Sequence, residues 1–214
     1  MISCRIVFFE AKTSYHPLDY KFYKSRVINL TLDYNCIQLH VSSSVFKRYI
    51  LKRKFFNEKI SFSEDTRFIN NILLFHPIMG ILKEAIFYYR RRNDFSSLIQ
   101  NRDNNFNFYF ETINSVFYYF LNTSLVLYNT IVSFIQFLVG YELLFRIQSR
   151  AYNILDSDNL KKYIFLIEEI LKKIEDKYIL EQNILSNKYK FFILSKKYQK
   201  DIRFHSKLIN DSII

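Results

Sequence analysis

Two pairs of adjacent carboxylates are the sequence's candidates for acid–base chemistry, which requires a proton donor or acceptor held beside a reacting group. Glu64 and Asp65 follow Ser63, and this order is explained by a helix start with an acidic first turn. Glu168 and Glu169 are typical of a solvated helix face. Because no nucleophile, base and orienting group can be proposed together, we expect no catalytic residues and a non-enzymatic protein.

Cysteine and histidine spacings give a weak metal-binding pattern. Cys36 and His40 lie four residues apart and would face the same side of a strand, while Cys4 and His16 would complete a four-ligand set. No close Cys-x-x-Cys pair accompanies them, which favours isolated structural side chains. The sequence therefore predicts no metal site.

Glycine is almost absent, since only Gly80 and Gly140 occur. Phosphate-binding loops, the dinucleotide fingerprint and the nucleophile elbow all use clustered glycines to bring backbone amides close to a ligand or to form a sharp turn. We therefore predict no nucleotide cofactor and no cofactor of any other kind.

Basic residues interleaved with aromatics are the one recurrent positive feature, in a chain with a net charge of +11. Cations neutralise phosphates and aromatic rings stack on unpaired bases. The leading hypothesis is a basic helical protein that binds RNA or associates with the ribosome. Its predicted nucleic-acid-binding residues are Lys47, Arg48, Lys52, Arg53, Lys54, Arg90, Arg91 and Arg92.

The composition also suggests an origin. The chain has 23 Phe and 17 Tyr against 2 Gly, 2 Pro and no Trp, a bias typical of an AT-rich gene. The same bias adds Lys, so the net charge is a weaker indicator of function than its size implies. No secretory or transit segment is evident at the start. We expect a protein encoded in a plastid or mitochondrial genome, with a cytoplasmic protein of an AT-rich microbe or virus as the alternative.

The first part of the chain contains the clearest strand pattern. Apolar residues alternate with polar ones over 28–34 and again over 37–41, which predicts a β-hairpin. Helices are expected over 45–56, from Ser63 to the residues before Pro77, and over 78–91. A polar linker, 96–107, is expected to separate the region 1–95 from the region 108–214.

An uncharged stretch lies between Glu111 and Glu142. Its second half, 124–141, approaches the length of a bilayer span but contains polar interruptions, and a buried central helix would look similar. The second hypothesis is therefore a single-span membrane-anchored subunit or assembly factor.

The last third carries apolar residues at helical spacing over 160–178, after a helix cap at either Asp156 or Asp158. This apolar seam supports a third hypothesis, a helical subunit of a larger complex that binds a protein partner through 160–178. The predicted fold class is mainly α, with an N-terminal β-hairpin packed on a helical bundle and a long C-terminal helix.

Overall fold

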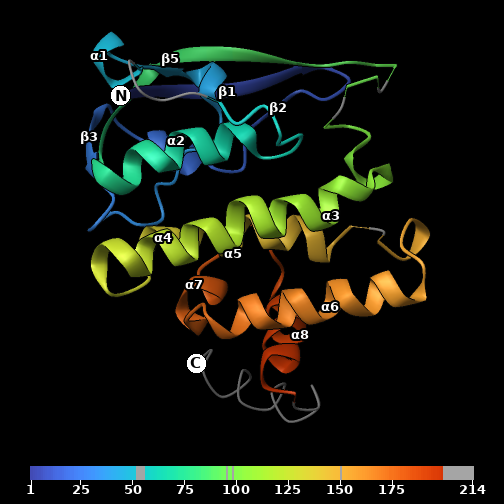
Figure 1. Cartoon of the computed structure of the whole chain (residues 1–214). Helices are drawn as coiled ribbons and strands as arrows, with labels where there is room; N and C mark the ends of the chain where they lie inside the picture. The colour runs from blue at the N-terminus through green and yellow to red at the C-terminus, as the bar shows by residue number, and fades with distance from the viewer. Residues whose placement is uncertain (52–55, 95, 98, 150, 200–214) are drawn as a thin grey trace, which may run out of the picture.

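A computed structural model of the chain describes residues 1–51, 56–94, 96–97, 99–149 and 151–199 (Figure 1). Its N-terminal part contains a mixed five-stranded sheet with the order β2-β1-β5-β3, and β4 also pairs with β1. β1 and β5 are parallel, with a register shift between Cys4 and Arg5, and the other pairs are antiparallel. The strands are β1 (Ile2–Glu10), β2 (Ser14–Tyr15), β3 (Arg26–Asn29), β4 (Ser44–Val45) and β5 (Ile78–Arg91).

The segment 78–91, predicted as a helix, is the longest strand, so that prediction is wrong. Its C-terminal half alternates between exposed and half-buried positions, as a strand with two unlike faces does. The basic and aromatic residues at this end obscured the alternation, while Pro77 marks the end of one element and the start of the next.

The predicted hairpin is also wrong. β3 pairs with β5 rather than with residues 37–41, which form no strand and lead into a short 3-10 turn, Val41–Ser43. The alternation nevertheless identified buried side chains, because Ile28, Leu30 and Ile37 are fully buried. These residues fill the space between the sheet and the helices without pairing with one another.

The helices lie in layers below the sheet (Figure 1). α2 lies directly against the sheet, α3 and α4 run in the next layer with α5 beside them, and α6 to α8 lie furthest from the sheet. A π-helical stretch, Ile113–Tyr118, joins α3 to α4. The helices are α1 (Arg48–Leu51), α2 (Glu64–Phe75), α3 (Phe106–Thr112), α4 (Tyr119–Tyr128), α5 (Ser133–Ile147), α6 (Ser157–Lys172), α7 (Asp176–Leu180) and α8 (Asn187–Tyr198).

The uncharged segment forms two helices rather than one. α4 ends at Tyr128, and its C-cap residue Asn129 has a left-handed φ of 56°. The Ser124 hydroxyl accepts a hydrogen bond from the Val132 amide and donates to the Thr130 carbonyl. The predicted span over 124–141 is therefore interrupted by a turn. Within the described residues, no helix has both the length and the apolar character needed to cross a bilayer.

The predicted long C-terminal helix is wrong as well. α6 begins as expected, because the Asp156 carboxylate accepts from the amides of Asp158 and Asn159. It ends at Lys172, and the apolar seam over 160–178 continues only in the short helix α7. The fold class is thus a mixed sheet covered by helices, not a mainly helical bundle with a hairpin. The division into regions 1–95 and 108–214 stays a prediction, although one core cluster contains residues of both.

Candidate active site

A cavity of about 340 Å³ opens where one end of the sheet, the start of α2 and the C-terminal half of α5 come together. The strands β1 and β5 supply Phe8, Tyr89 and Arg91, and α5 supplies Tyr141, Glu142, Phe145 and Arg146. The remaining wall includes Lys12, His16, His40, Phe62, Ser63, Glu64, Asp65, Thr66, Arg102 and Phe108. A concave site with apolar walls and a few converging polar groups is the usual form of a substrate site.

Two carboxylates at the start of α2 line this cavity. Burial raises the pKa of Glu64, and it also raises the pKa of Asp65. The Asp65 Oδ2 atom accepts a hydrogen bond from the Val41 amide at 3.0 Å, which opposes the shift and fixes the carboxylate. A carboxylate held in one orientation with a raised pKa is suited to accept a proton.

A buried ion pair on α5 holds the start of α2 in place. Arg146 donates from Nη1 to Glu142 Oε2 at 2.9 Å, one helical turn away. The Ser63 hydroxyl donates to Glu142 Oε2 at 3.1 Å and accepts from Arg146 Nη2 at 3.1 Å. Thr66 adds a longer contact to Glu142 Oε1 at 3.4 Å. The first turn of α2 is therefore attached to α5 by side chains.

Ser63 itself has a strained backbone. Its φ of 61° lies in the left-handed region, and its hydroxyl makes no capping bond to α2 although it occupies the N-cap position. A left-handed conformation costs an L-residue roughly 1–2 kcal/mol. The Ser63 hydroxyl, which would ordinarily cap the helix, instead contacts Glu142 and Arg146. The strained conformation of Ser63 thus allows contacts that line the cavity in place of a helix cap.

Two buried polar atoms of the cavity's lining residues have no hydrogen-bond partner in the described part of the chain. They are Nε of Arg146, whose side chain is 2% exposed, and the hydroxyl of Tyr141. Nearly all buried polar atoms in folded proteins have a partner, so each of these two atoms calls for an explanation, such as a bound water, ion or ligand. The guanidinium also lies over the rings of Phe108 and Phe117, at 4.6 and 5.0 Å.

Three further cations also line the cavity. Lys12, Arg91 and Arg102 also line a second hollow of about 430 Å³, so the two hollows share one basic wall. Arg91 lies 5.0 Å from the centroid of the Phe8 ring, and Arg102 is 3.4 Å from Asp103. Guanidinium groups are well matched to phosphate oxygens, which makes this wall suited to an anionic group.

Among the described residues, the predicted nucleic-acid-binding residues lie in two segments, one at the start of α1 and one at the end of β5. Of the arginine run, Arg91 faces the cavity, while Arg90 bonds Glu10 and Arg92 bonds Ser96. Lys47 directly precedes α1 and Arg48 begins it. Lys52, Arg53 and Lys54 lie outside the described residues. Nucleic-acid binding by this set stays a prediction of the sequence alone.

The four residues of the weak metal-binding pattern, Cys4, His16, Cys36 and His40, do not form one ligand set in the structure. His16 and His40 contact each other, whereas the Cys4 thiol donates to the Ser43 carbonyl and Cys36 contacts Arg26. Among the described residues, no group of three or more His, Cys, Asp or Glu side chains is placed to hold a metal ion.

The sequence did contain signals for this site. Adjacent residues of a strand point to opposite faces, so a run of three arginines must place the middle one apart from its neighbours. Glu142 precedes Arg146 by four residues, the favourable order for an ion pair on a helix. Glu64 and Asp65 were recognised, but the helix-start interpretation explained them completely and hid their place in the cavity.

Two bacterial proteins are similar to this chain. It is 28% identical over 203 residues to the minor teichoic acid biosynthesis protein GgaB of Bacillus subtilis (strain 168), a match that covers 92% of this chain and 22% of that protein. It is 28% identical over 196 residues to the minor teichoic acid biosynthesis protein GgaA of the same organism, covering 89% and 42%. The chain thus spans less than half the length of either relative. No protein-family model and no solved structure matches it.

These relatives correct the functional predictions. Both are named as biosynthesis proteins, which contradicts a non-enzymatic protein and RNA or the ribosome as its partner. The alternatives of a membrane-anchored subunit and of a helical subunit acting through 160–178 are contradicted by the same finding. Both relatives come from a bacterium, which has no plastid or mitochondrion, so the predicted compartment is wrong too.

The Arg146–Glu142 pair predicts a coupled effect on stability. Replacing Arg146 by Met leaves the Glu142 carboxylate without its cation, and breaking a buried pair on one side typically costs about 3–5 kcal/mol. The double variant Arg146→Met with Glu142→Gln should recover much of this loss, because it leaves no uncompensated charge. Urea denaturation of both variants measures the difference.

A matched control is Lys161→Met, since the Lys161 side chain is 79% exposed and its ion pair with Asp158 lies at the surface. Its effect should stay within about 0.5 kcal/mol. Equal losses in the single and double variants would contradict the coupling.

Proposed function

We propose that this chain supplies part of a glycosyl-transfer site used in teichoic acid biosynthesis. The named role of GgaA and GgaB, each 28% identical to this chain, supports the pathway. The cavity supports the chemistry, because its lining includes both carboxylates at the start of α2 and several cations. The chain spans only part of each relative, so the proposal concerns this site and not the whole activity of those proteins.

We assign the role of the base in this transfer to Asp65. Transfer of a sugar to an alcohol requires a base near the hydroxyl, and a carboxylate with a raised pKa is a stronger proton acceptor than an exposed one. Asp65 is preferred over Glu64 because the Val41 amide donates a hydrogen bond to Asp65 Oδ2 at 3.0 Å. This bond fixes the orientation of the carboxylate and therefore the direction of its other oxygen. Glu64 adjoins Asp65, whose negative charge, after burial, further raises the pKa of Glu64.

The reaction balances with these groups alone. The acceptor's O–H bond breaks and its proton passes to Asp65, while the oxygen forms a bond to the anomeric carbon of the donor sugar. The bond from that carbon to the phosphate oxygen of the leaving group breaks, and the electron pair stays on the phosphate. Lys12, Arg91 and Arg102 would stabilise the added negative charge, which is the usual role of cations at a leaving phosphate.

Replacing Asp65 by Asn should abolish the transfer without disrupting the fold. Asn keeps an oxygen that can accept from Val41 but cannot take up the proton, so kcat should fall by about 10²–10⁴-fold with little change in KM. The assay supplies nucleoside-diphosphate sugars with an oligomeric glycerol phosphate acceptor and measures the nucleoside diphosphate released.

Glu168→Gln is the matched control, since Glu168 lies on α6, away from the cavity's lining residues. An Asp65→Asn variant that turns over at the unaltered rate would rule Asp65 out as the base. If the unaltered protein releases nucleoside diphosphate only when acceptor is present, transfer itself is established.

The Asp65→Asn substitution should also stabilise the folded protein, by an amount that grows as the pH rises. The folded-state pKa of Asp65 is raised above its usual 3.8, so its protonated form favours folding and this contribution is lost as the pH rises through the raised pKa. The amide introduced by Asp65→Asn carries no charge at any pH. Melting temperatures should therefore be higher for the variant than for the unaltered protein at pH 8, and the difference should vanish below pH 3.8. A lower melting temperature at pH 8 would contradict a desolvated carboxylate at this position.

Arg91 should contribute to anion binding. Replacing it by Gln removes a charged donor from the cavity, and a hydrogen bond to a charged group is worth about 1.5–3 kcal/mol, so the dissociation constant for inorganic pyrophosphate should rise at least roughly tenfold. Calorimetric titration at two salt concentrations measures this, and the salt dependence should become shallower. Arg90→Gln is the control from the neighbouring position, because Arg90 bonds Glu10 instead of lining the cavity. Equal effects of the two substitutions would remove Arg91 from the site.

A further inference from the structure

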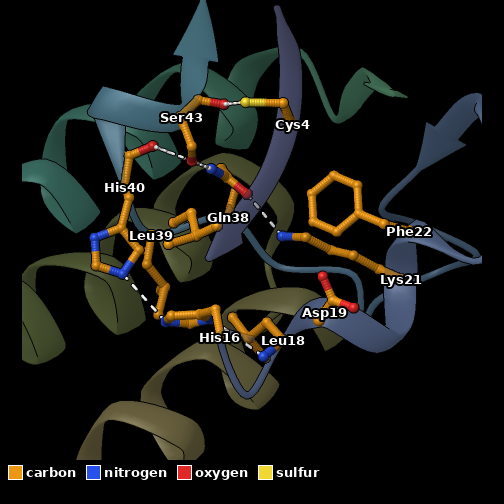
Figure 2. A pocket seen from close by; sticks show the side chains of 11 residues that line it. Cys4, His16, Leu18, Asp19, Lys21, Phe22, Gln38, Leu39, His40 and Ser43 are labelled. Carbon is orange, nitrogen blue, oxygen red and sulfur yellow. Dashed lines mark hydrogen bonds between the residues drawn. The ribbon is translucent and has the colours of Figure 1, made fainter. Parts of the chain in front are cut away.

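Two histidines form a contact at the edge of the cavity. His16 and His40 approach through their Nε2 atoms at 3.2 Å, with the rings nearly perpendicular at 82° (Figure 2). Both residues line the cavity that contains Asp65. Two imidazole nitrogens at this distance must share one hydrogen, so one ring donates and the other accepts.

The backbone decides which ring donates. The Leu18 amide donates a hydrogen bond to His16 Nδ1 at 3.1 Å, so this nitrogen carries no proton. A neutral His16 therefore carries its proton on Nε2 and donates it toward His40. The Nε2 of His40 is then the acceptor, and a neutral His40 carries its own proton on Nδ1.

Both rings are neutral in the folded protein. Burial lowers the pKa of His16 to about 2 and the pKa of His40 to about 4, from the usual 6.5. The positive charges of Lys21 and Arg91 act in the same direction on both rings, and a charged His40 would further oppose protonation of His16. Glu142 favours a charged His40, but its effect is smaller than that of burial.

The segment that carries His40 is held by a buried polar network. The His40 carbonyl accepts from Gln38 Nε2 at 3.0 Å and from the hydroxyls of Ser43 and Ser44. Lys21, which is 2% exposed, donates to Gln38 Oε1 at 2.7 Å (Figure 2). The next residue along the chain, Val41, is the amide donor to Asp65. One short segment thus positions both the imidazole and the carboxylate.

The second nitrogen of His40 is available to a ligand. It points away from His16 in Figure 2, and none of the described residues bonds it. We propose that His40 Nδ1–H donates a hydrogen bond to the oxygen of the acceptor hydroxyl, and that His16 is the positioning residue that fixes this tautomer. The inference rests on the proposed function, since it names a second contact to the same hydroxyl.

This arrangement defines the class of acceptor. A neutral donor beside a carboxylate binds an alcohol, because the oxygen accepts from His40 while its proton is directed toward Asp65. An ionised carboxylate or phosphate at this point has no proton to pass to Asp65, so it could not use both contacts. The acceptor end is therefore a hydroxyl of a sugar or polyol.

Nitrogen NMR of the full chain tests the tautomers without any substrate. Long-range proton–nitrogen correlation should show His16 protonated at Nε2 and His40 protonated at Nδ1, both unchanged between pH 8 and pH 5. His16→Asn retains an acceptor for the Leu18 amide and removes the donor to His40, so the His40 ring should become a mixture of tautomers. A single Nε2-protonated His40 in the unaltered protein, or an unchanged His40 in the His16→Asn variant, would overturn the assignment.

Kinetics test the contact to the acceptor. His40→Ala should raise the KM for an oligomeric glycerol phosphate acceptor about tenfold, the loss expected for one hydrogen bond. His40→Asn places an amide N–H near the position of Nδ1 and should restore the KM to within about threefold of the unaltered value, because it replaces that one hydrogen bond. Failure of the Asn variant to do better than the Ala variant, with both folded by circular dichroism, would refute the contact.

The two failures can be told apart. If no transfer occurs in the unaltered protein but the NMR assignment holds, the proposed function fails and the fixed tautomer pair remains. If transfer requires Asp65 but is insensitive to the His40→Ala substitution, the proposed function stands and the His40 contact is wrong.

Discussion

The buried guanidinium of Arg146 connects α5 to the start of α2, and both helices line the cavity. It lies among aromatic rings, pairs with Glu142 and reaches Ser63 at the start of α2. A buried ion pair is weak support for stability, because apolar residues of the same volume are often as good or better. In this protein the ion pair instead fixes the position of the start of α2 relative to α5. Since the Ser63 hydroxyl contacts this pair instead of capping the helix, the direction of the first turn of α2, and with it Asp65, is fixed from α5.

The charges around the cavity respond to pH in opposite ways. Glu64 and Asp65 have raised pKa values, so their contribution to folding stability is present in acid and is lost as the pH rises through those values. His16 and His40 have lowered pKa values, so their contribution is present above the usual 6.5 and is lost as the pH falls through the lowered values. Because burial lowers the pKa of both imidazoles, they are neutral near pH 7, and in the proposed transfer a carboxylate is the group that takes up the proton.

Local sequence signals predicted some elements and misassigned others. The starts of α2 and α6 could be predicted, because an N-cap residue and an acidic first turn lie next to each other in the chain. The strand β5 could not, because its partners β1 and β3 are distant in the sequence and its aromatic content suits either conformation. For the site, Asp65 and Glu142 each have an ordinary local sequence. Their common cavity depends on contacts such as Ser63 to Glu142, across 79 positions, which no pattern reveals.

Catalysis was excluded because no nucleophile, base and orienting group could be proposed together, and cofactors were excluded because glycine is scarce. Without clustered glycines a chain cannot bring its backbone around a phosphate. A site made from side chains has no such requirement. Here the amide of Val41 orients a carboxylate, the amide of Leu18 selects a histidine tautomer, and arginine side chains line the cavity. In a chain with few glycines, buried polar groups that interrupt apolar segments are therefore a better guide to an active site than loop motifs.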